Sequence, residues 1–173
     1  MLPTGDLATF DDPMAILTVC HGNLRRYATL TARLAEYVDE NGCGDEATEA
    51  AERVIRYFAV AAKQHHQDEE DDLFPALRAL DDPSLSALLV ELEVEHLALE
   101  QLWIPVYAWL RQVADGVADS VPKRMLDEFV LRYPAHADRE EREVFPHASR
   151  LDAHTLTRIG ERMSHRRGLA VQA

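Results

Sequence analysis

Residues 65–75, HHQDEEDDLFP, and residues 136–146, HADREEREVFP, share one pattern that decides the fold of this chain. Both read His-x-x-x-Glu-Glu-x-x-aliphatic-Phe-Pro, and each matched position is offset by 71 residues. Residues four apart lie on one face of a helix, about one turn apart, so each copy directs an imidazole and a carboxylate the same way. Two such helices facing each other would offer four ligands to a pair of metal ions. The repeat therefore predicts a metal site between two helices.

The composition is typical of one globular helical domain. The 173 residues are 47% apolar but only 7% aromatic, so we expect one domain, residues 1–173, with a core mainly of Ala, Leu and Val. The scarcity of glycine, with 7 residues, favours helices over strands. The net charge of −13 argues against general nucleic-acid binding, because phosphate contacts need a basic surface.

The sequence also bears on the cellular compartment. Cys20 and Cys43 lack metal-type spacing, and two cysteines are typical of a reducing compartment. Asp6, Asp11 and Asp12 stand where a signal peptide would carry positive charge and then an apolar run. No stretch approaches the ~20 apolar residues of a membrane span. We therefore expect a cytoplasmic protein with no membrane partner.

Four long helices and a short one are expected from apolar periodicity and end signals. Asp12-Pro13 and Asp82-Pro83 are helix starts, whereas residues 41–44 and 115–116 end helices. The expected helices cover about residues 12–41, 46–80, 82–115, 122–146 and 152–164. Short connections between long helices predict an all-α, antiparallel up-down-up-down four-helix bundle over residues 12–150, with a short helix and tail over 151–173. Prolines within or at the ends of the helices should kink or end them; they are Pro75, Pro105, Pro134 and Pro146.

On each long apolar stripe, a position that should be aliphatic is instead a candidate metal ligand. These candidates are His21, His65, Glu69, His96, His136 and Glu140. A buried carboxylate without a partner is very costly, and two of them among four imidazoles are hard to satisfy by hydrogen bonds alone. Two metal ions would satisfy all six. Imidazole suits iron, zinc and copper, and an imidazole–carboxylate mixture suits iron in particular.

The register of the first copy has two readings, because His66 and Glu70 are also four residues apart. The Phe-Pro end aligns His65 with His136, so we expect His65 and Glu69 to face inward. His66, about 100° away around the helix, is expected beside the ligands or at the surface. The rest of the run 68–72, and Glu91, Glu93, Glu95 and Glu100, are expected on solvated faces. The simpler alternative to a metal ligand, for a single histidine such as His21 or His96, is a hydrogen-bonded core residue.

The ordered histidines and the repeated signature resemble the hemerythrin-like (HHE cation-binding) domain family, stand-alone bacterial type, over about residues 12–150. The resemblance implies a four-helix bundle that holds an oxo- or hydroxo-bridged pair of iron ions. It also implies that the four histidines are terminal ligands and that Glu69 and Glu140 bridge the two irons.

The chain departs from the oxygen-carrying members in one respect. Those proteins have a fifth histidine on the third helix, one turn from the first. Here the positions four residues from His96 are Leu92 and Glu100, so that imidazole is missing.

The leading functional hypothesis is a non-haem di-iron protein that binds or senses oxygen or nitric oxide. The alternative is a di-iron redox enzyme, or an iron donor, in the nitrosative and oxidative stress response and iron–sulfur cluster repair. That alternative needs a redox partner, and no flavin or iron–sulfur motif is visible. A metal-free helical interaction protein, a zinc or mixed-metal site, and the choice between monomer and homodimer stay open. No catalytic residue and no further cofactor are assigned.

Overall fold

A computed structural model of the chain describes residues 9–168 and contains ten helical elements in that range. The elements are α1 Pro13–Asn41, α2 Asp45–Arg56, η1 Tyr57–Ala62, α3 Lys63–Asp68, η2 Glu69–Leu73, α4 Phe74–Arg78, α5 Pro83–Ala114, α6 Lys123–Glu143, η3 Phe145–Arg150 and α7 Ala153–Arg166. Asp6 and both ends of the predicted 1–173 domain lie outside the described residues.

The helix ends follow the residues that predicted them. The side chains of Asp12 and Asp82 accept hydrogen bonds from the backbone N–H groups three residues on, at 3.0 and 3.2 Å, and each precedes a proline in the first helical turn. Asp152 caps α7 in the same way, at 2.8 Å. α1 ends at Gly42, whose φ of 73° lies in the left-handed region.

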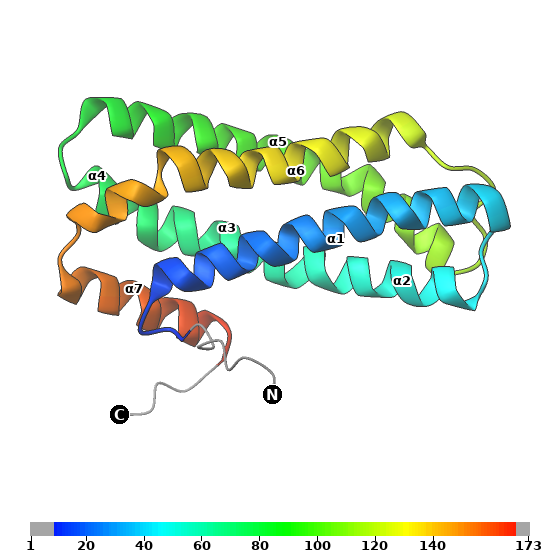
Figure 1. Cartoon of the computed structure of the whole chain (residues 1–173), viewed down its shortest axis with the longest axis horizontal. Helices are drawn as coiled ribbons and strands as arrows, with labels where there is room; N and C mark the ends of the chain where they lie inside the picture. The colour runs from blue at the N-terminus through cyan, green and yellow to red at the C-terminus, as the bar shows by residue number, and fades with distance from the viewer. Residues whose placement is uncertain (1–8, 169–173) are drawn as a thin grey trace, which may run out of the picture.

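The long helices form an antiparallel four-helix bundle (Figure 1). α1 packs against α2 and α6, and α5 packs against the same two helices from the opposite corner. The consecutive elements from α2 to α4 together form one of the four long rods of the bundle. α7 lies outside the bundle, against α1, α3 and η2. The predicted all-α fold is confirmed. Among the described residues, no helix is long and apolar enough to cross a membrane.

The second segment differs in detail from the single helix expected over residues 46–80. Two turns of π-helix, η1 and η2, interrupt it on either side of α3. A π turn inserts extra backbone into an α-helix, and such turns are frequent at functional sites. Pro105 and Pro134 do not end α5 and α6, both of which continue past them.

The core is divided into two clusters. One contains Leu24, Val54 and Phe58 among its buried members, and the other contains Leu17 and Phe74. Between the two clusters, the buried positions of the long helices carry histidine and glutamate. The bundle is therefore two apolar cores separated by one polar layer.

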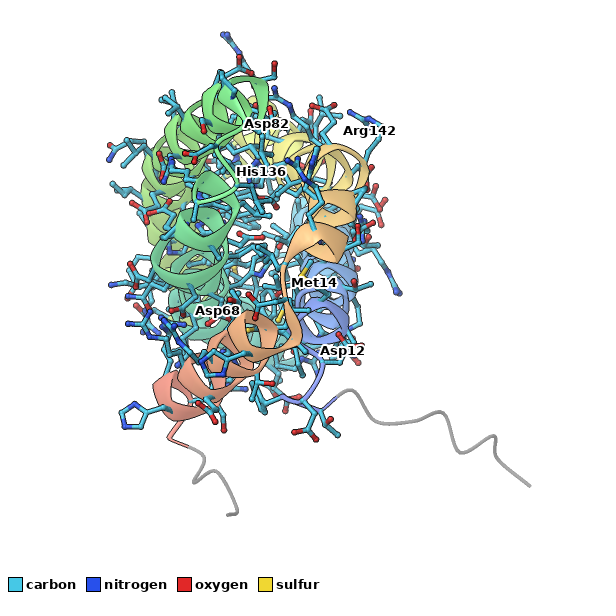
Figure 2. All side chains as sticks on the ribbon, turned by 90° about the vertical axis from the view of Figure 1, so that its left-hand side faces the viewer. Asp12, Met14, Asp68, Asp82, His136 and Arg142 are labelled. Atoms are coloured by element: carbon cyan, nitrogen blue, oxygen red, sulfur yellow. The ribbon has the colours of Figure 1, made fainter. Side chains whose placement is uncertain are left out.

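α7 is fixed by buried carboxylates that the sequence argument had placed on a solvated face. Asp68 and Asp72 are 0% and 4% exposed. Asp68 accepts from Arg167 at 2.6 Å and also from Arg166, and Asp72 accepts from Arg166 at 2.8 Å. The prediction of a solvated face was wrong for these two residues, because α7 covers them and supplies their counter-charges. Figure 2 shows Asp68 beside α7 and His136 among the bundle helices, viewed from this end.

Candidate metal centre

Seven buried side chains from α1, α3, η2, α5 and α6 meet in the polar layer. They form two groups, and in each group one nitrogen or oxygen atom from every residue lies within 4.8 Å of the corresponding atoms of the others. The first group is His21, His65, Glu69 and Glu140, and the second is His66, His96 and His136. The fold thus brings together all six predicted ligand candidates and adds His66.

His66 lies inside the site, whereas the sequence argument gave it no place among the ligands. Its side chain is 5% exposed, and its ring stacks on that of His96 with the centroids 4.0 Å apart. Its neighbour His65 instead faces His21 of α1, at 4.7 Å between centroids. The sequence-based prediction let only one of the two adjacent histidines, His65 and His66, face the interior. A helix in a bundle has two neighbours, however, so residues about 100° apart can each face one of them.

The two glutamates of the first group also reach histidines of the second group. Glu140 has Oε2 3.2 Å from Nε2 of His21 and Oε1 3.1 Å from Nε2 of His136. Glu69 has Oε1 3.5 Å from Nε2 of His65 and Oε2 3.6 Å from Nε2 of His96. Each carboxylate therefore turns one oxygen to each group, which is the arrangement that a bridging ligand requires.

The second glutamate of each repeat orients a histidine on another helix. Nδ1 of His96 donates to Glu70 at 2.6 Å, and Nδ1 of His21 donates to Glu141 at 2.9 Å. An ionised carboxylate only accepts, so these bonds place a ring proton on Nδ1 and turn Nε2 toward the centre, where Nε2 of His96 lies 3.3 Å from Oε1 of Glu140. The first glutamate of each pair thus faces the centre, and the second orients a histidine. The presence of the second glutamate in both copies of the motif was the sequence signal for this orienting role.

A third outer carboxylate comes from α5. Glu95 accepts from Nδ1 of His136 at 2.8 Å and pairs with Arg139. Glu141 is held in turn by Arg25, at 3.0 Å. The sequence predicts a solvated face for Glu95, and its side chain is 38% exposed, but the sequence gives no sign of its hydrogen bond to the buried ring of His136.

Burial and mutual repulsion control the electrostatics of the layer. Burial, and then the charge of Glu140, raise the pKa of Glu69 well above its usual value. Burial also lowers the pKa values of His65 and His66, which favours the neutral imidazole that binds metals. Burial opposes ionisation of Glu140 too, but the imidazoles of His136, His21 and His96, whose Nε2 atoms lie 3.1, 3.2 and 3.3 Å from its oxygens, outweigh burial and hold that pKa well below its usual value.

The donor atoms of the layer fit a metal centre because protein groups do not satisfy them. Buried atoms without a hydrogen-bond partner include Nε2 of His21, His65, His66 and His136, both carboxylate oxygens of Glu69, and Oε2 of Glu140. Leaving such atoms unpaired is costly, and native proteins rarely do so. All of them belong to the two groups, and imidazole nitrogen with carboxylate oxygen is a donor set for transition metals.

Comparison with known proteins agrees with this geometry. The family model described as the hemerythrin HHE cation binding domain matches residues 12–148. The chain belongs to this family. An uncharacterized protein of Haemophilus influenzae (strain ATCC 51907 / DSM 11121 / KW20 / Rd) is 29% identical over 167 residues, which is 96% of each chain.

This hemerythrin-like chain places five imidazoles in its polar layer. The sequence argument found no fifth histidine one turn from His96, and Leu92 and Glu100 do occupy those positions. The fifth ring comes from His66, on the helix that also carries His65. The number of imidazoles is thus one more than the sequence argument allowed, and the extra ring stands on another helix.

Proposed function

We propose that this protein is a non-haem di-iron protein that binds or senses oxygen or nitric oxide. The observation that carries the proposal is the pair of donor groups joined by Glu69 and Glu140, most of whose inward-facing nitrogen and oxygen atoms are buried without a hydrogen-bond partner. His21 and His65 would hold one ion, and His66, His96 and His136 the other. When bound, the ions supply sites for a small diatomic ligand and for one-electron chemistry.

Iron is proposed over other metals because of the donor set. Five imidazoles and two carboxylates include no thiolate, which argues against the soft-ligand sites of copper(I) and structural zinc. Ferritin-like di-iron enzymes use more carboxylates in a Glu-x-x-His arrangement. A set with fewer anionic ligands stabilises highly oxidised iron less, which favours reversible ligand binding or mild redox chemistry.

The unequal division of the imidazoles indicates where an external ligand binds. With both carboxylates shared, the His21–His65 side has one imidazole fewer than the other side. That side therefore keeps the more open coordination. Its surroundings include an apolar ring, because Phe145 stacks on His21 with the centroids 5.1 Å apart. An apolar neighbour suits an uncharged diatomic molecule.

Metal analysis and visible absorption of the purified protein test the proposal. We expect about two iron ions per chain, an oxo-to-iron charge-transfer band in the oxidised form, and reversible changes when oxygen or nitric oxide is added to the reduced form. One ion per chain, or only zinc after expression in iron-rich medium, would contradict it. Turnover of nitric oxide or peroxide with an added reductant would instead favour the redox enzyme.

Chelation gives an independent measurement. A ligand that binds only the folded state stabilises it by roughly 4 kcal/mol at a thousandfold excess over Kd. Removing the metal should therefore lower the melting temperature by several degrees at this chain length. Equal melting temperatures of the loaded and stripped protein would count against a metal-centred core.

A further inference from the structure

A row of aromatic rings runs from the surface of α1 to the candidate metal centre. Tyr27 stacks on Tyr57 at 4.2 Å between centroids, and Tyr57 meets Phe58 at 5.1 Å. Phe58 meets Tyr133 at 5.1 Å, and Tyr133 stacks on His66 at 6.4 Å. Tyr27 and Tyr57 are partly exposed, whereas the other three rings are buried. The row thus connects solvent to one of the proposed iron ligands.

The rings are held in place by contacts besides packing. The hydroxyl of Tyr57 donates to the backbone carbonyl of Cys20 at 3.1 Å, and that of Tyr133 donates to the carbonyl of Leu99 at 3.3 Å. The first π turn, η1, begins with Tyr57 and Phe58. These consecutive residues point in different directions, one toward α1 and the other into the core.

The surface end of the row lies in a basic groove. A hollow of about 550 Å³ is lined by Tyr27 together with Arg26, Arg33 and Arg53. Within residues 9–168, no carboxylate lies within ion-pair distance of these three arginines. Arg26 lies over the ring of Tyr27, at 4.9 Å from its centroid, whereas Arg25 is paired with carboxylates of α6. On a chain of net charge −13, arginines that stand outside any ion pair and gather around an aromatic ring mark a surface for an acidic partner.

We propose that this groove docks an acidic one-electron carrier protein of the ferredoxin or flavodoxin type, and that the ring row conducts its electron to the metal centre. The inference rests on the proposed di-iron function. In each event the carrier loses one electron and one ferric ion becomes ferrous, and two events reduce the pair. Electron transfer weakens steeply with each non-bonded gap, and closely spaced π systems keep these gaps short.

A second branch of rings reaches the surface elsewhere. Trp103 lies 5.2 Å from Phe58 and 5.8 Å from Tyr107, which is 41% exposed. This branch has longer gaps than the stacked pair Tyr27–Tyr57. It also ends outside the groove that holds the arginines. We therefore assign electron entry to the groove. A variant of Trp103, in the other branch, serves as the control for a variant of Tyr57.

The docking surface is tested with a reduced plant-type [2Fe–2S] ferredoxin as the probe, an acidic carrier of low potential. The double variant Arg33→Ser/Arg53→Ser is compared with Arg124→Ser/Arg158→Ser, which removes two likewise exposed arginines, outside any ion pair among the described residues, from α6 and α7. Anaerobic stopped-flow reduction of the oxidised iron protein should slow about tenfold at low salt in the first variant only. Equal rates in both variants would overturn the docking surface.

The ring row is tested by Tyr57→Leu against Trp103→Leu, with iron content and circular dichroism checked for each variant. We expect Tyr57→Leu to slow reduction by an order of magnitude without changing ferredoxin affinity. Tyr57→Phe, which keeps the ring, should restore the rate. An unchanged rate in Tyr57→Leu, or a loss confined to Trp103→Leu, would overturn the route.

Ferredoxin binding to the iron-free chain, measured by calorimetry, separates this inference from the proposed function. Binding that depends on Arg33 and Arg53 in a chain that never takes up iron would uphold the docking surface while the di-iron function fails. A di-iron chain whose reduction ignores Arg33, Arg53 and Tyr57 would keep its proposed function and refute the inference.

Discussion

The two copies of the repeat share a sequence pattern but continue differently. After Glu69 the first copy passes through the π turn η2 and on into α4. The second copy ends its α-helix at Glu143 and turns through the 3₁₀ segment η3. Both place the residue after the first histidine in the interior, as His66 in one copy and Ala137 in the other.

The comparison separates what the motif encodes from what each copy adds. In both copies the first glutamate lies at the centre and the second orients a histidine from another helix. The first copy adds a third imidazole to the second donor group by having histidine where the other has alanine. A nearly two-fold symmetric site thereby becomes unequal, with one side more open than the other.

The largest effect is expected for the central glutamates, which both copies share. The double variant Glu69→Gln/Glu140→Gln tests them. We expect this variant to lose both metal ions, and with them the sensitivity of its melting temperature to chelators, because neither amide can serve as an anionic bridge. Inductively coupled plasma mass spectrometry and a thermal melt with and without chelator measure this. Glu93→Gln, at a surface ion pair with Arg78, is the control and should keep its metal. Full metal content in the double variant would refute the bridging role.

The extra imidazole of His66, which only the first copy has, is tested by His66→Ala. Because His66 belongs to the second donor group, its loss should lower the iron content clearly, though less than His65→Ala, which removes one of only two imidazoles on its side. Gln67→Ala, the next residue along, should leave the iron content unchanged. Should His66→Ala retain the wild-type iron content, the unequal division of imidazoles described above would be wrong.

The second glutamates allow a direct comparison of the copies. Glu70→Gln and Glu141→Gln should each weaken metal binding by about 10–100-fold, as loss of an outer partner of a histidine ligand typically does. The larger loss is expected for Glu141, because Arg25 holds it in place whereas Glu70 is 40% exposed and has no such support. Competition with a chromogenic chelator measures the affinities. Asp71→Asn serves as the control, and an effect of equal size there would indicate a general charge effect.

The last prediction concerns the clamp on α7, outside the polar layer. Arg166→Ala leaves oxygens of Asp68 and Asp72 without one of their donors, although Arg167 still pairs with Asp68, so it should cost about 1–3 kcal/mol of unfolding free energy. Arg162→Ala, whose side chain is 62% exposed, should cost at most about 1 kcal/mol. Urea denaturation of the two variants measures the difference. Equal stabilities would show that the buried carboxylates do not depend on α7.

The sequence predicted the bundle because capping aspartates and apolar stripes are local signals, and it predicted six members of the polar layer because each interrupts a stripe. It did not predict the contacts of His66, Glu95 and Asp68, which are set by other helices. His66 depends on which two helices its own helix contacts, and Asp68 on arginines about a hundred positions later in the chain. Ala137, an apolar residue at the place that matches His66, was the available hint.

That separation along the chain affects the order in which the protein is made. A ribosome releases α3 and η2 long before α7, and Asp68 meets Arg166 only after 98 more residues are synthesised. Likewise, His21 meets Glu141, the carboxylate that accepts from its Nδ1, only after 120 more residues are synthesised. Nascent chains therefore present several ligands without their orienting partners. A metal ion delivered during translation would meet an unfinished site, so we expect metal insertion after the chain has left the ribosome.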